Sequence, residues 1–250
     1  MSRWLSKAAA RLRTLLQPAV VFVGGASVDE ARAQFEAWAR EHAGSVCEIG
    51  LGGAWVHTCV VPAEVAEATQ SDDEAWLDYA RLQFEHYFGI SAGLGGAWTL
   101  AASRDARAAL VCAVSSELLA VLRAVASAHH VSVRRVAPWW ARGAQAALRE
   151  ELQSGWQGDA SGATARVAAA VEPGRTTLVV AQDGRIVRVV GEASGAPHDW
   201  RARLQDSAGA ASLWSFKLTA DEPEQLDQLA RTLRGQIEPE LVFQRIEGAA

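Results

Sequence analysis

The sequence predicts an α/β protein made of two lobes, each with a mixed sheet flanked by helices. Apolar runs of strand length alternate with segments of helical periodicity, and residues 164–250 read as three strands, a helix, a strand, a helix and a strand. A segment containing glycine and serine at residues 154–163 reads as a linker. The predicted organisation is a basic helix at 1–18, a first lobe at 19–153, the linker, and a second lobe at 164–250.

Six apolar runs of strand length occur in the first lobe. The second and third are joined through Gly52-Gly53, which indicates a turn between two strands. The first run, with its continuous apolar residues, is typical of a buried strand. The predicted strands are Ala19–Val23, Val46–Leu51, Trp55–Val61, Trp98–Ala102, Leu110–Val114 and Val131–Val136.

Four segments between these runs have helix patterns. Asp29 and Glu30 lie near the positive end of the first, and Ser71-Asp72-Asp73-Glu74 supplies capping residues for the second. Gly89 ends the second helix, and Pro138 suits the first turn of the fourth. The predicted helices are Val28–His42, Ser71–Phe88, Ser115–Ala128 and Pro138–Leu152.

The second lobe has the more regular pattern. Asp183-Gly184 favours a tight hairpin between its second and third strands, because this pair tolerates positive φ. Gly235 ends its last helix. The predicted strands are Ala165–Val171, Thr176–Gln182, Arg185–Gly191, Ser212–Thr219 and Leu241–Ile246, and the predicted helices are His198–Ser207 and Asp221–Gly235.

Composition limits the classes of function. Half of the 250 residues are hydrophobic, which predicts a substantial core, and the net charge of −5 argues against nucleic acid as the main partner. The three cysteines have no tight spacing and are expected to be small buried side chains in a reducing compartment. No apolar run approaches the roughly 20 residues that a membrane span needs. A cytoplasmic protein is expected.

The first 17 residues differ from the rest in charge. Arg3, Lys7, Arg11 and Arg13 contribute +4 without any acid, so the remaining chain carries −9. Their spacing, with apolar residues opposite, predicts a basic amphipathic helix that ends at Pro18. Two interpretations stay open: a helix that lies on the inner membrane surface or on a partner, and an ordinary terminal helix packed against the domain.

Several familiar active sites are excluded. A Walker phosphate loop needs a lysine after its glycines, and the only lysines, Lys7 and Lys217, lack that context. There is no Gly-x-Ser-x-Gly motif. Cys47, His57 and Cys59 could supply three metal ligands, but no convincing fourth ligand accompanies them. We therefore expect neither catalytic residues nor a metal site.

Aromatic residues are the stronger surface signal. The chain has ten tryptophans and two tyrosines. Trp76 and Tyr79 share a helical stripe, and the adjacent Trp139 and Trp140 cannot both face one side of a helix. Two interpretations stay open, a core role and a protein-docking surface, since aromatic residues are enriched in interfaces. These four residues are the predicted partner-binding set.

The order of elements and three apolar runs resemble a known family. The runs Ala109–Arg123, Ala128–Pro138 and Ala168–Arg185, within a resemblance that covers Leu51 to Ile246, look like the GspL cytoplasmic domain and PilM. These are scaffold proteins of type II secretion and type IV pilus systems in the ribonuclease-H/actin-like superfamily. The resemblance implies the actin-like fold, in which the first hairpin of each lobe holds a nucleotide phosphate.

The sequence departs from that family at the phosphate hairpins. PilM-like members carry an aspartate in each hairpin, whereas this chain has Glu172-Pro173-Gly174 at the second, where the proline removes a backbone donor. The first carries Gly24-Gly25 without an adjacent acid before Asp29. Any surviving cofactor site is expected at Glu172, Gly174, Thr176 and Thr177.

The resemblance therefore implies a non-catalytic cytoplasmic scaffold, in a pilus or secretion assembly, that binds an inner-membrane partner. No cofactor is expected. Two alternatives stay open: a protein that binds ATP and Mg²⁺ through altered phosphate loops, and an interaction module unrelated to pili.

Overall fold

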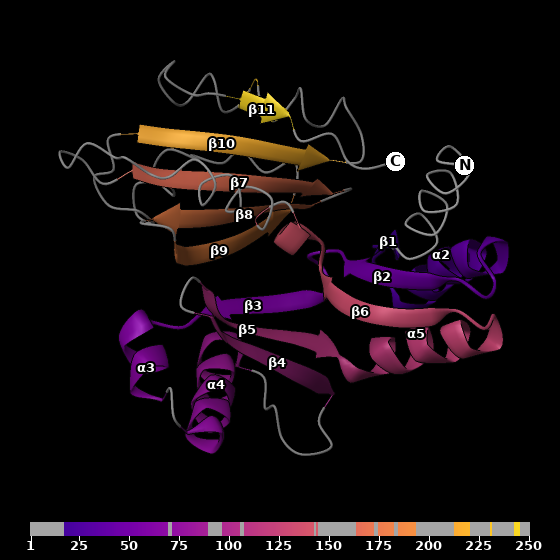
Figure 1. The fold of residues 1–250 in the computed structure, drawn as a ribbon, viewed down its shortest axis with the longest axis horizontal. Helices are drawn as coiled ribbons and strands as arrows, with labels where there is room; N and C mark the ends of the chain where they lie inside the picture. The colour runs from indigo at the N-terminus through magenta and orange to yellow at the C-terminus, as the bar shows by residue number, and fades with distance from the viewer. Residues whose placement is uncertain are drawn as a thin grey trace, which may run out of the picture.

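Figure 1 shows the computed structural model of the chain, which describes residues 18–69, 72–89, 97–105, 108–142, 144, 164–172, 175–182, 185–193, 213–220, 231 and 243–245. None of the helices in these ranges is both long and apolar enough to cross a membrane. The predicted N-terminal helix, the linker and, apart from residue 231, both second-lobe helices lie outside the described residues.

The first sheet is parallel and has the order β1-β2-β6. Helices α2 and α5 pack together against it (Figure 1), with Phe35, Leu118 and Leu122 among the residues they bury in its core. The elements are β1 (Ala19–Val23), α2 (Val28–Glu41), β2 (Val46–Leu51), α5 (Ser116–Ala128) and β6 (Ser132–Pro138).

The second sheet is antiparallel and has the order β3-β5-β4. Helix α4 buries Trp76, Ala80 and Phe84 against it. Asp72 caps the start of α4 by accepting from Glu74 N and Ala75 N, and Gly89 ends it at φ 61°. The elements are β3 (Val56–Val60), α3 (Ala63–Ala68), α4 (Asp73–Phe88), β4 (Trp98–Asp105) and β5 (Ala108–Ser115).

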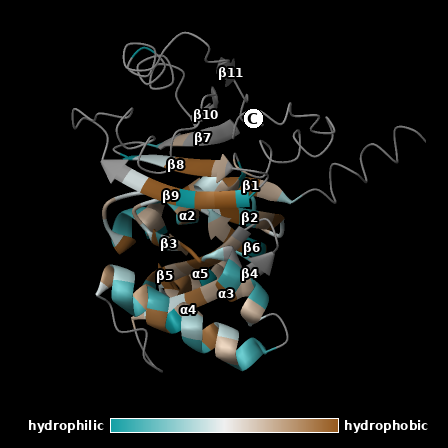
Figure 2. Ribbon diagram, turned by 90° about the vertical axis from the view of Figure 1, so that its left-hand side faces the viewer, coloured by the Kyte–Doolittle hydropathy of each residue, from teal (hydrophilic) through white to brown (hydrophobic). Residues whose placement is uncertain are grey.

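The third sheet is mixed and has the order β11-β10-β7-β8-β9. Strands β7, β8 and β9 form an antiparallel meander, and β10 and β11 add in parallel beside β7. Figure 2 shows apolar residues along β8 and β9, interrupted on β9 by hydrophilic ones. The elements are β7 (Thr164–Glu172), β8 (Arg175–Gln182), β9 (Arg185–Ala193), β10 (Leu213–Ala220) and β11 (Phe243–Arg245), which confirms the predicted strand order of residues 164–250.

The prediction that residues 19–153 form a single mixed sheet is wrong. The strands themselves are where they were predicted, but they form two sheets of three. Strand β2 is the middle strand of its sheet, so both of its edges are occupied by β1 and β6. Because β3 finds no free edge on β2 after the Gly52–Trp55 turn, it joins β5 in a separate sheet.

Two further differences are local. Helix α3 was not predicted, because its six residues are too few to show periodicity. Pro138 ends β6 rather than opening a helix, and the helical residues begin at Trp139. A proline is tolerated there because β6 is an edge strand that, among the described strands, pairs only with β2. The outward N–H groups of β6 are not needed for the sheet.

Candidate functional site

The buried polar side chains of the described residues gather at one end of the β7–β8 hairpin. Glu172 and Thr177 are 4% and 3% exposed, and Thr176 is also buried. The sequence placed these three residues in the predicted cofactor site together with Gly174, which lies outside the described residues. The structure therefore brings the described members of that set together in a protein interior.

The β2–β3 turn docks against this end of the hairpin. Gly53 donates its backbone N–H to Glu172 Oε2 at 2.7 Å, and a Cβ placed on Gly52 would lie 3.0 Å from the same oxygen. Thr177 Oγ1 would lie 2.9 Å from a Cβ on Gly53. Both glycines are therefore required, because a side chain at either position would collide with Glu172 or Thr177. The backbone N–H of Gly53 is satisfied by the carboxylate of Glu172.

The turn between β1 and α2 lies beside the same junction. Trp55 Nε1 donates to Gly24 O at 3.2 Å, which ties the two glycine turns together. Gly24 N donates to Gln34 Oε1 at 2.9 Å, and Ala26 N donates to Glu30 Oε2 at 2.7 Å. The positive end of α2 thus faces acidic side chains of its own first turn.

These contacts bear on phosphate binding. A phosphate loop works by presenting backbone N–H groups to the anion, often at a helix N-terminus. Here the N–H groups of Gly24, Ala26 and Gly53 each donate to a side-chain oxygen of the chain. An incoming phosphate would have to displace these oxygens and would meet the acidic groups of Glu30 and Glu172.

A pocket of about 560 Å³ opens next to the hairpin end. Its walls come from β3 on one side and from β8 and β9 on the other, with Tyr87 and Phe88 of α4 and with Trp140. Its lining contains Arg175 and Arg188 but no aspartate or glutamate among the described residues. The pocket therefore combines a positive charge with an apolar and aromatic wall.

Arg175 is held in this pocket by two glycines. A Cβ on Gly191 would lie 2.6 Å from Arg175 Nη2, and a Cβ on Gly53 would lie 3.1 Å from Arg175 Nε. The Nε atom is buried and has no hydrogen-bond partner among the described residues. Both glycines are therefore needed to let the guanidinium lie where it does.

His57 of β3 lines the same pocket from the opposite side. Its ring contacts Phe88 and Trp98, with centroids 4.9 and 4.7 Å away. Burial, together with the positive charge of Arg175, lowers the pKa of His57 below its ordinary value of 6.5. The imidazole is therefore neutral at pH 7, and the arginines provide the pocket's positive charge.

The predicted partner-binding residues are not brought together. Trp76 and Trp140 are each 3% exposed, so both rings are core residues rather than parts of a docking surface. Trp76 packs between α4 and the β3-β5-β4 sheet, while Trp140 joins a cluster with Val179 and Ile186 of the five-stranded sheet. Helical spacing alone does not distinguish the buried side of a helix from its exposed side.

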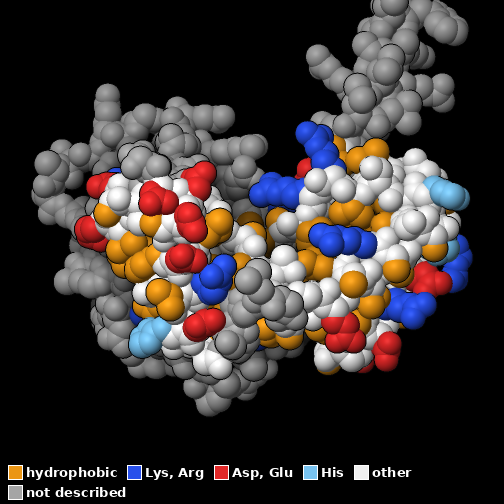
Figure 3. All heavy atoms as spheres, turned by 90° about the horizontal axis from the view of Figure 1, so that it is seen from below, with side chains coloured by type: hydrophobic (Ala, Val, Ile, Leu, Met, Phe, Trp, Pro, Cys, Tyr) orange, Lys and Arg blue, Asp and Glu red, His pale blue; other side chains and the backbone are white. Residues whose placement is uncertain are grey.

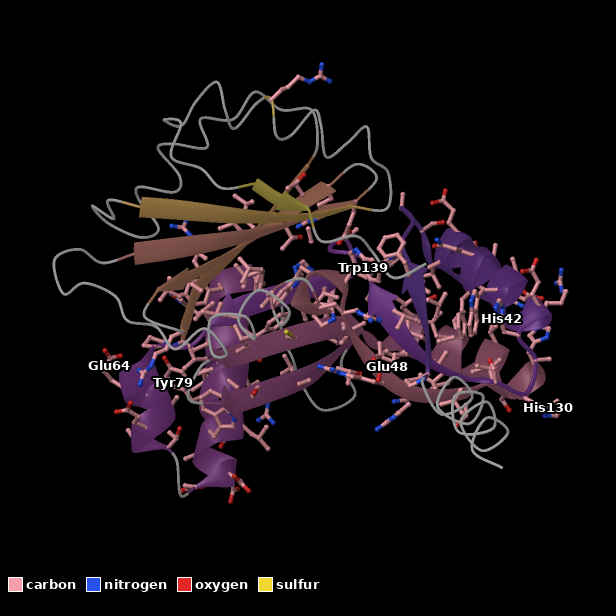
Figure 4. The ribbon with its side chains drawn as sticks, turned by 45° about the horizontal axis from the view of Figure 1, so that its top comes forward. His42, Glu48, Glu64, Tyr79, His130 and Trp139 are labelled. Atoms are coloured by element: carbon pink, nitrogen blue, oxygen red, sulfur yellow. The ribbon has the colours of Figure 1, made fainter. Side chains whose placement is uncertain are left out.

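The other two predicted partner-binding residues are partly exposed but lie far apart, as Figure 4 shows. Trp139 packs edge-on against Phe22, at a centroid distance of 5.2 Å, and lies over Gly50. Tyr79 lies on α4 near the β3-β5-β4 core. The predicted membrane-surface residues Arg3, Lys7, Arg11 and Arg13 are outside the described residues.

The cysteines and His57 do not form a metal site. Within the described ranges, no three His, Cys, Asp or Glu side chains lie close enough together to hold an ion. Cys47 and Cys59 belong to different cores, and burial raises the pKa of each thiol to about 11. These cysteines are free thiols, as expected for small buried side chains.

Sequence analysis missed Arg175, Gly191 and the pocket they form. Arg175 directly follows the hairpin turn that was singled out, so its position was a usable signal. Gly191 gave no signal, because a glycine near the end of a strand has many explanations. The pairing of Arg175 with Gly53 and His57 required the packing of two sheets.

Known proteins resemble this chain in structure, and no sequence comparison finds a relative. No family model matches the chain, and no curated protein sequence matches it. Solved structures with a similar fold include the following three. The first is a protein of unknown function with an actin-like ATPase fold from Bacteroides thetaiotaomicron VPI-5482, with a TM-score of 0.50 and 10% identity, over 79% of this chain and 68% of that one.

The second is a PilM-PilN type IV pilus biogenesis complex, with a TM-score of 0.53 and 10% identity, over 92% of this chain and 77% of that one. The third is the cytoplasmic domain of EpsL, an inner membrane component of the type II secretion system of Vibrio cholerae, with a TM-score of 0.43 and 13% identity, over 88% and 75% of the two chains. The resemblance predicted from the sequence is confirmed at the level of the fold: this chain has the actin-like ATPase fold.

Proposed function

We propose that this protein is a non-catalytic, cytoplasmic scaffold with two actin-like lobes, and that it holds an inner-membrane partner in a type IV pilus or type II secretion-like assembly. The observation that carries the loss of catalysis is the bond from Gly53 N to Glu172 Oε2 at 2.7 Å. It holds a carboxylate of the chain at the second phosphate hairpin, where its negative charge would repel a nucleotide phosphate.

The assignment to a pilus or secretion assembly is supported by the fold. A PilM-PilN complex of type IV pilus biogenesis shares it over 92% of this chain. In this proposal, strands β7 to β11, which form the mixed sheet, belong to the second lobe. The two three-stranded sheets belong to the first lobe.

The charge distribution supports contact with a membrane surface. Figure 3 shows acidic side chains gathered over α3 and α4 on one half of the face, and arginines mixed with some acidic side chains on the other half. Arg134 and Arg135 of β6 are both exposed. This arginine-bearing half suits the anionic inner leaflet, and in this proposal the α3–α4 half faces away from it. The sequence adds a +4 charge in residues 1–17, which the same leaflet would attract.

Titration calorimetry with Mg-ATP tests the loss of nucleotide binding. We expect no heat at millimolar nucleotide for the wild-type chain. We also expect none for Glu172→Ala, because the Gly24 and Ala26 donors stay occupied. Saturable heat with the wild-type chain would contradict the proposal and favour the alternative of a nucleotide-binding protein.

Affinity purification of the tagged full chain from its native cells tests the assembly. The expected result is co-purification of inner-membrane pilus or secretion components. Recovery of soluble proteins alone would leave the fold standing and remove the assigned function. Reciprocal tagging of a recovered component separates a direct partner from a contaminant.

Membrane fractionation tests the anchoring role of the N-terminal charges. Changing Arg3, Lys7, Arg11 and Arg13 to glutamine should move the protein from the membrane fraction to the supernatant. The matched control changes four arginines on described helices to glutamine, namely Arg32, Arg40, Arg81 and Arg123. Equal shifts in both variants would show a general charge effect and not a specific anchor.

A further inference from the structure

The pocket beside Arg175 is formed by the free edges of two sheets. Within the described ranges, strand β9 ends the five-stranded sheet and pairs only with β8, while β3 ends its own sheet and pairs only with β5. Figure 1 shows β9 lying above β3. Among the described residues no backbone hydrogen bond joins the two strands.

The lining shows that the strand edges themselves face the pocket. Residues 56–60 of β3 and residues 187–191 of β9 all line it, as two unbroken runs of five. Successive side chains of a strand point to opposite faces, so a face would contribute only alternate residues. An unbroken run therefore indicates that the backbone edge, with its outward N–H and C=O groups, borders the pocket.

The β9 edge is the more accessible of the two. Val187 is 39% exposed, Arg188 and Gly191 are exposed, and Val189 and Val190 are half-buried. Folded proteins usually block such an edge, because it is a template for another strand. Five residues of an added strand would extend about 17 Å along it.

The charge at the pocket selects the kind of strand that fits. Arg175 and Arg188 line it, and no acid does so among the described residues. The guanidinium of Arg175 has a buried Nε without a hydrogen-bond partner in the described part of the chain. A guanidinium matches a carboxylate with two parallel hydrogen bonds, which the terminal Nη groups of Arg175 can donate from the pocket wall.

We propose that this pocket binds an extended acidic segment of a partner protein, which adds as a strand to the free edge of β9 and places one Asp or Glu carboxylate on Arg175. Apolar side chains of the segment lie against Tyr87, Phe88 and Trp140. This inference does not depend on the assembly proposed above, since the pocket's edges and charges define the ligand whichever machine contains the protein.

Selection from a phage-displayed library of random nonapeptides on the full chain tests the proposal without knowledge of the partner. The expected result is a consensus with Asp or Glu at one fixed position between β-branched or aromatic residues, and its loss when Arg175→Gln is the target. A consensus without an acidic position, or the same consensus on Arg175→Gln, overturns the proposal.

Fluorescence anisotropy with a labelled consensus peptide then measures each contribution. On the wild-type chain, a twin peptide with Gln or Asn in place of the fixed acid should bind about 10- to 100-fold more weakly, the range for a lost charge-assisted hydrogen bond. This comparison needs no protein variant, so it decides the matter even if Arg175→Gln fails to fold. Arg123→Gln, on the exposed side of α5, is the matched control and should bind the peptide as the wild type does.

Backbone methylation distinguishes strand addition from simple charge attraction. In an added strand, alternate N–H groups point toward the edge and the others point away. N-methylation of one alternate set should abolish binding, whereas methylation of the other set should leave it within a few fold. Equal effects of the two sets would show that the peptide does not add to the sheet edge and would overturn the proposal.

Discussion

Gly53 donates its backbone N–H to the Oε2 atom of Glu172 across 119 residues of sequence. This bond fastens the β2–β3 turn to the end of β7. Because that turn connects the two three-stranded sheets, the bond joins both of them to the five-stranded sheet. It lies next to the pocket that Arg175 and His57 line from opposite sides.

Replacing Glu172 with alanine should lower the free energy of unfolding by about 1–3 kcal/mol, because the Gly53 N–H is left buried without an acceptor. Glu172→Gln should cost less, since the amide oxygen can still accept. Urea denaturation measures both. Glu41→Ala at the exposed end of α2 is the matched control, with an expected change within about 0.5 kcal/mol. Equal costs at the two positions would show that the bond contributes nothing to stability.

Replacing Gly191 with alanine should destabilise the protein by about 1–3 kcal/mol, because the new Cβ overlaps the Arg175 guanidinium. The hypothetical Cβ lies 2.6 Å from Nη2, which is closer than side chains pack. In an Arg175→Ala background the same change should cost much less. Urea denaturation of the four proteins gives the coupling energy. Additive effects would mean that the glycine is not required by the arginine.

His57 should make stability fall as the pH is lowered. Burial and Arg175 lower the pKa of His57 in the folded state below 6.5, the value expected when the chain is unfolded. Above pH 6.5 the His57 imidazole is neutral in both the folded and the unfolded state, so the protein keeps its full free energy of unfolding. Below it the unfolded state binds the proton first, so stability falls until the folded pKa is reached.

The comparison that isolates this effect is wild type against His57→Gln, by urea denaturation between pH 7.5 and 5. The wild type should lose more stability over this range than the variant does. Arg175→Gln should reduce the difference, because one of the two causes of the lowered pKa is removed. Parallel pH profiles for wild type and His57→Gln would contradict the assignment.

The cysteines should resist alkylation in the folded protein. Burial raises the pKa of Cys47 and of Cys59 to about 11 and also raises that of Cys112, so the reactive thiolate is scarce at pH 8. Mass spectrometry after iodoacetamide treatment should find these three thiols unmodified in buffer and modified in denaturant. Rapid labelling of Cys47, which is fully buried, would show that the first core opens readily.

Removing a core ring should cost more than any of these changes. Phe35 of α2 is fully buried between α2 and the β1-β2-β6 sheet. Phe35→Ala should lower the free energy of unfolding by about 3–5 kcal/mol, because it loses apolar burial and leaves a cavity. Denaturant unfolding measures it. Leu82→Ala on the exposed side of α4 is the control and should change stability little.

The sequence predicted those elements whose signals lie within a few residues. The strand Val46–Leu51 and the α4 helix with its Asp72 cap and Gly89 end appear as predicted. The order of strands in residues 164–250 and the resemblance to the actin-like fold are also confirmed. Alternation, capping residues and turn glycines act locally, so they can be read without the fold.

Contacts between distant residues were decided by the tertiary structure. The sequence did not show that β3 leaves β2 for another sheet, that Trp76 and Trp140 are buried, or that Glu172 accepts from Gly53. Each depends on which strand edges are already paired and on how three sheets pack around the hairpin. The sequence by itself determined the elements and their order; packing decided which of their side chains meet, because burial and close approach are properties of segments far apart in the chain.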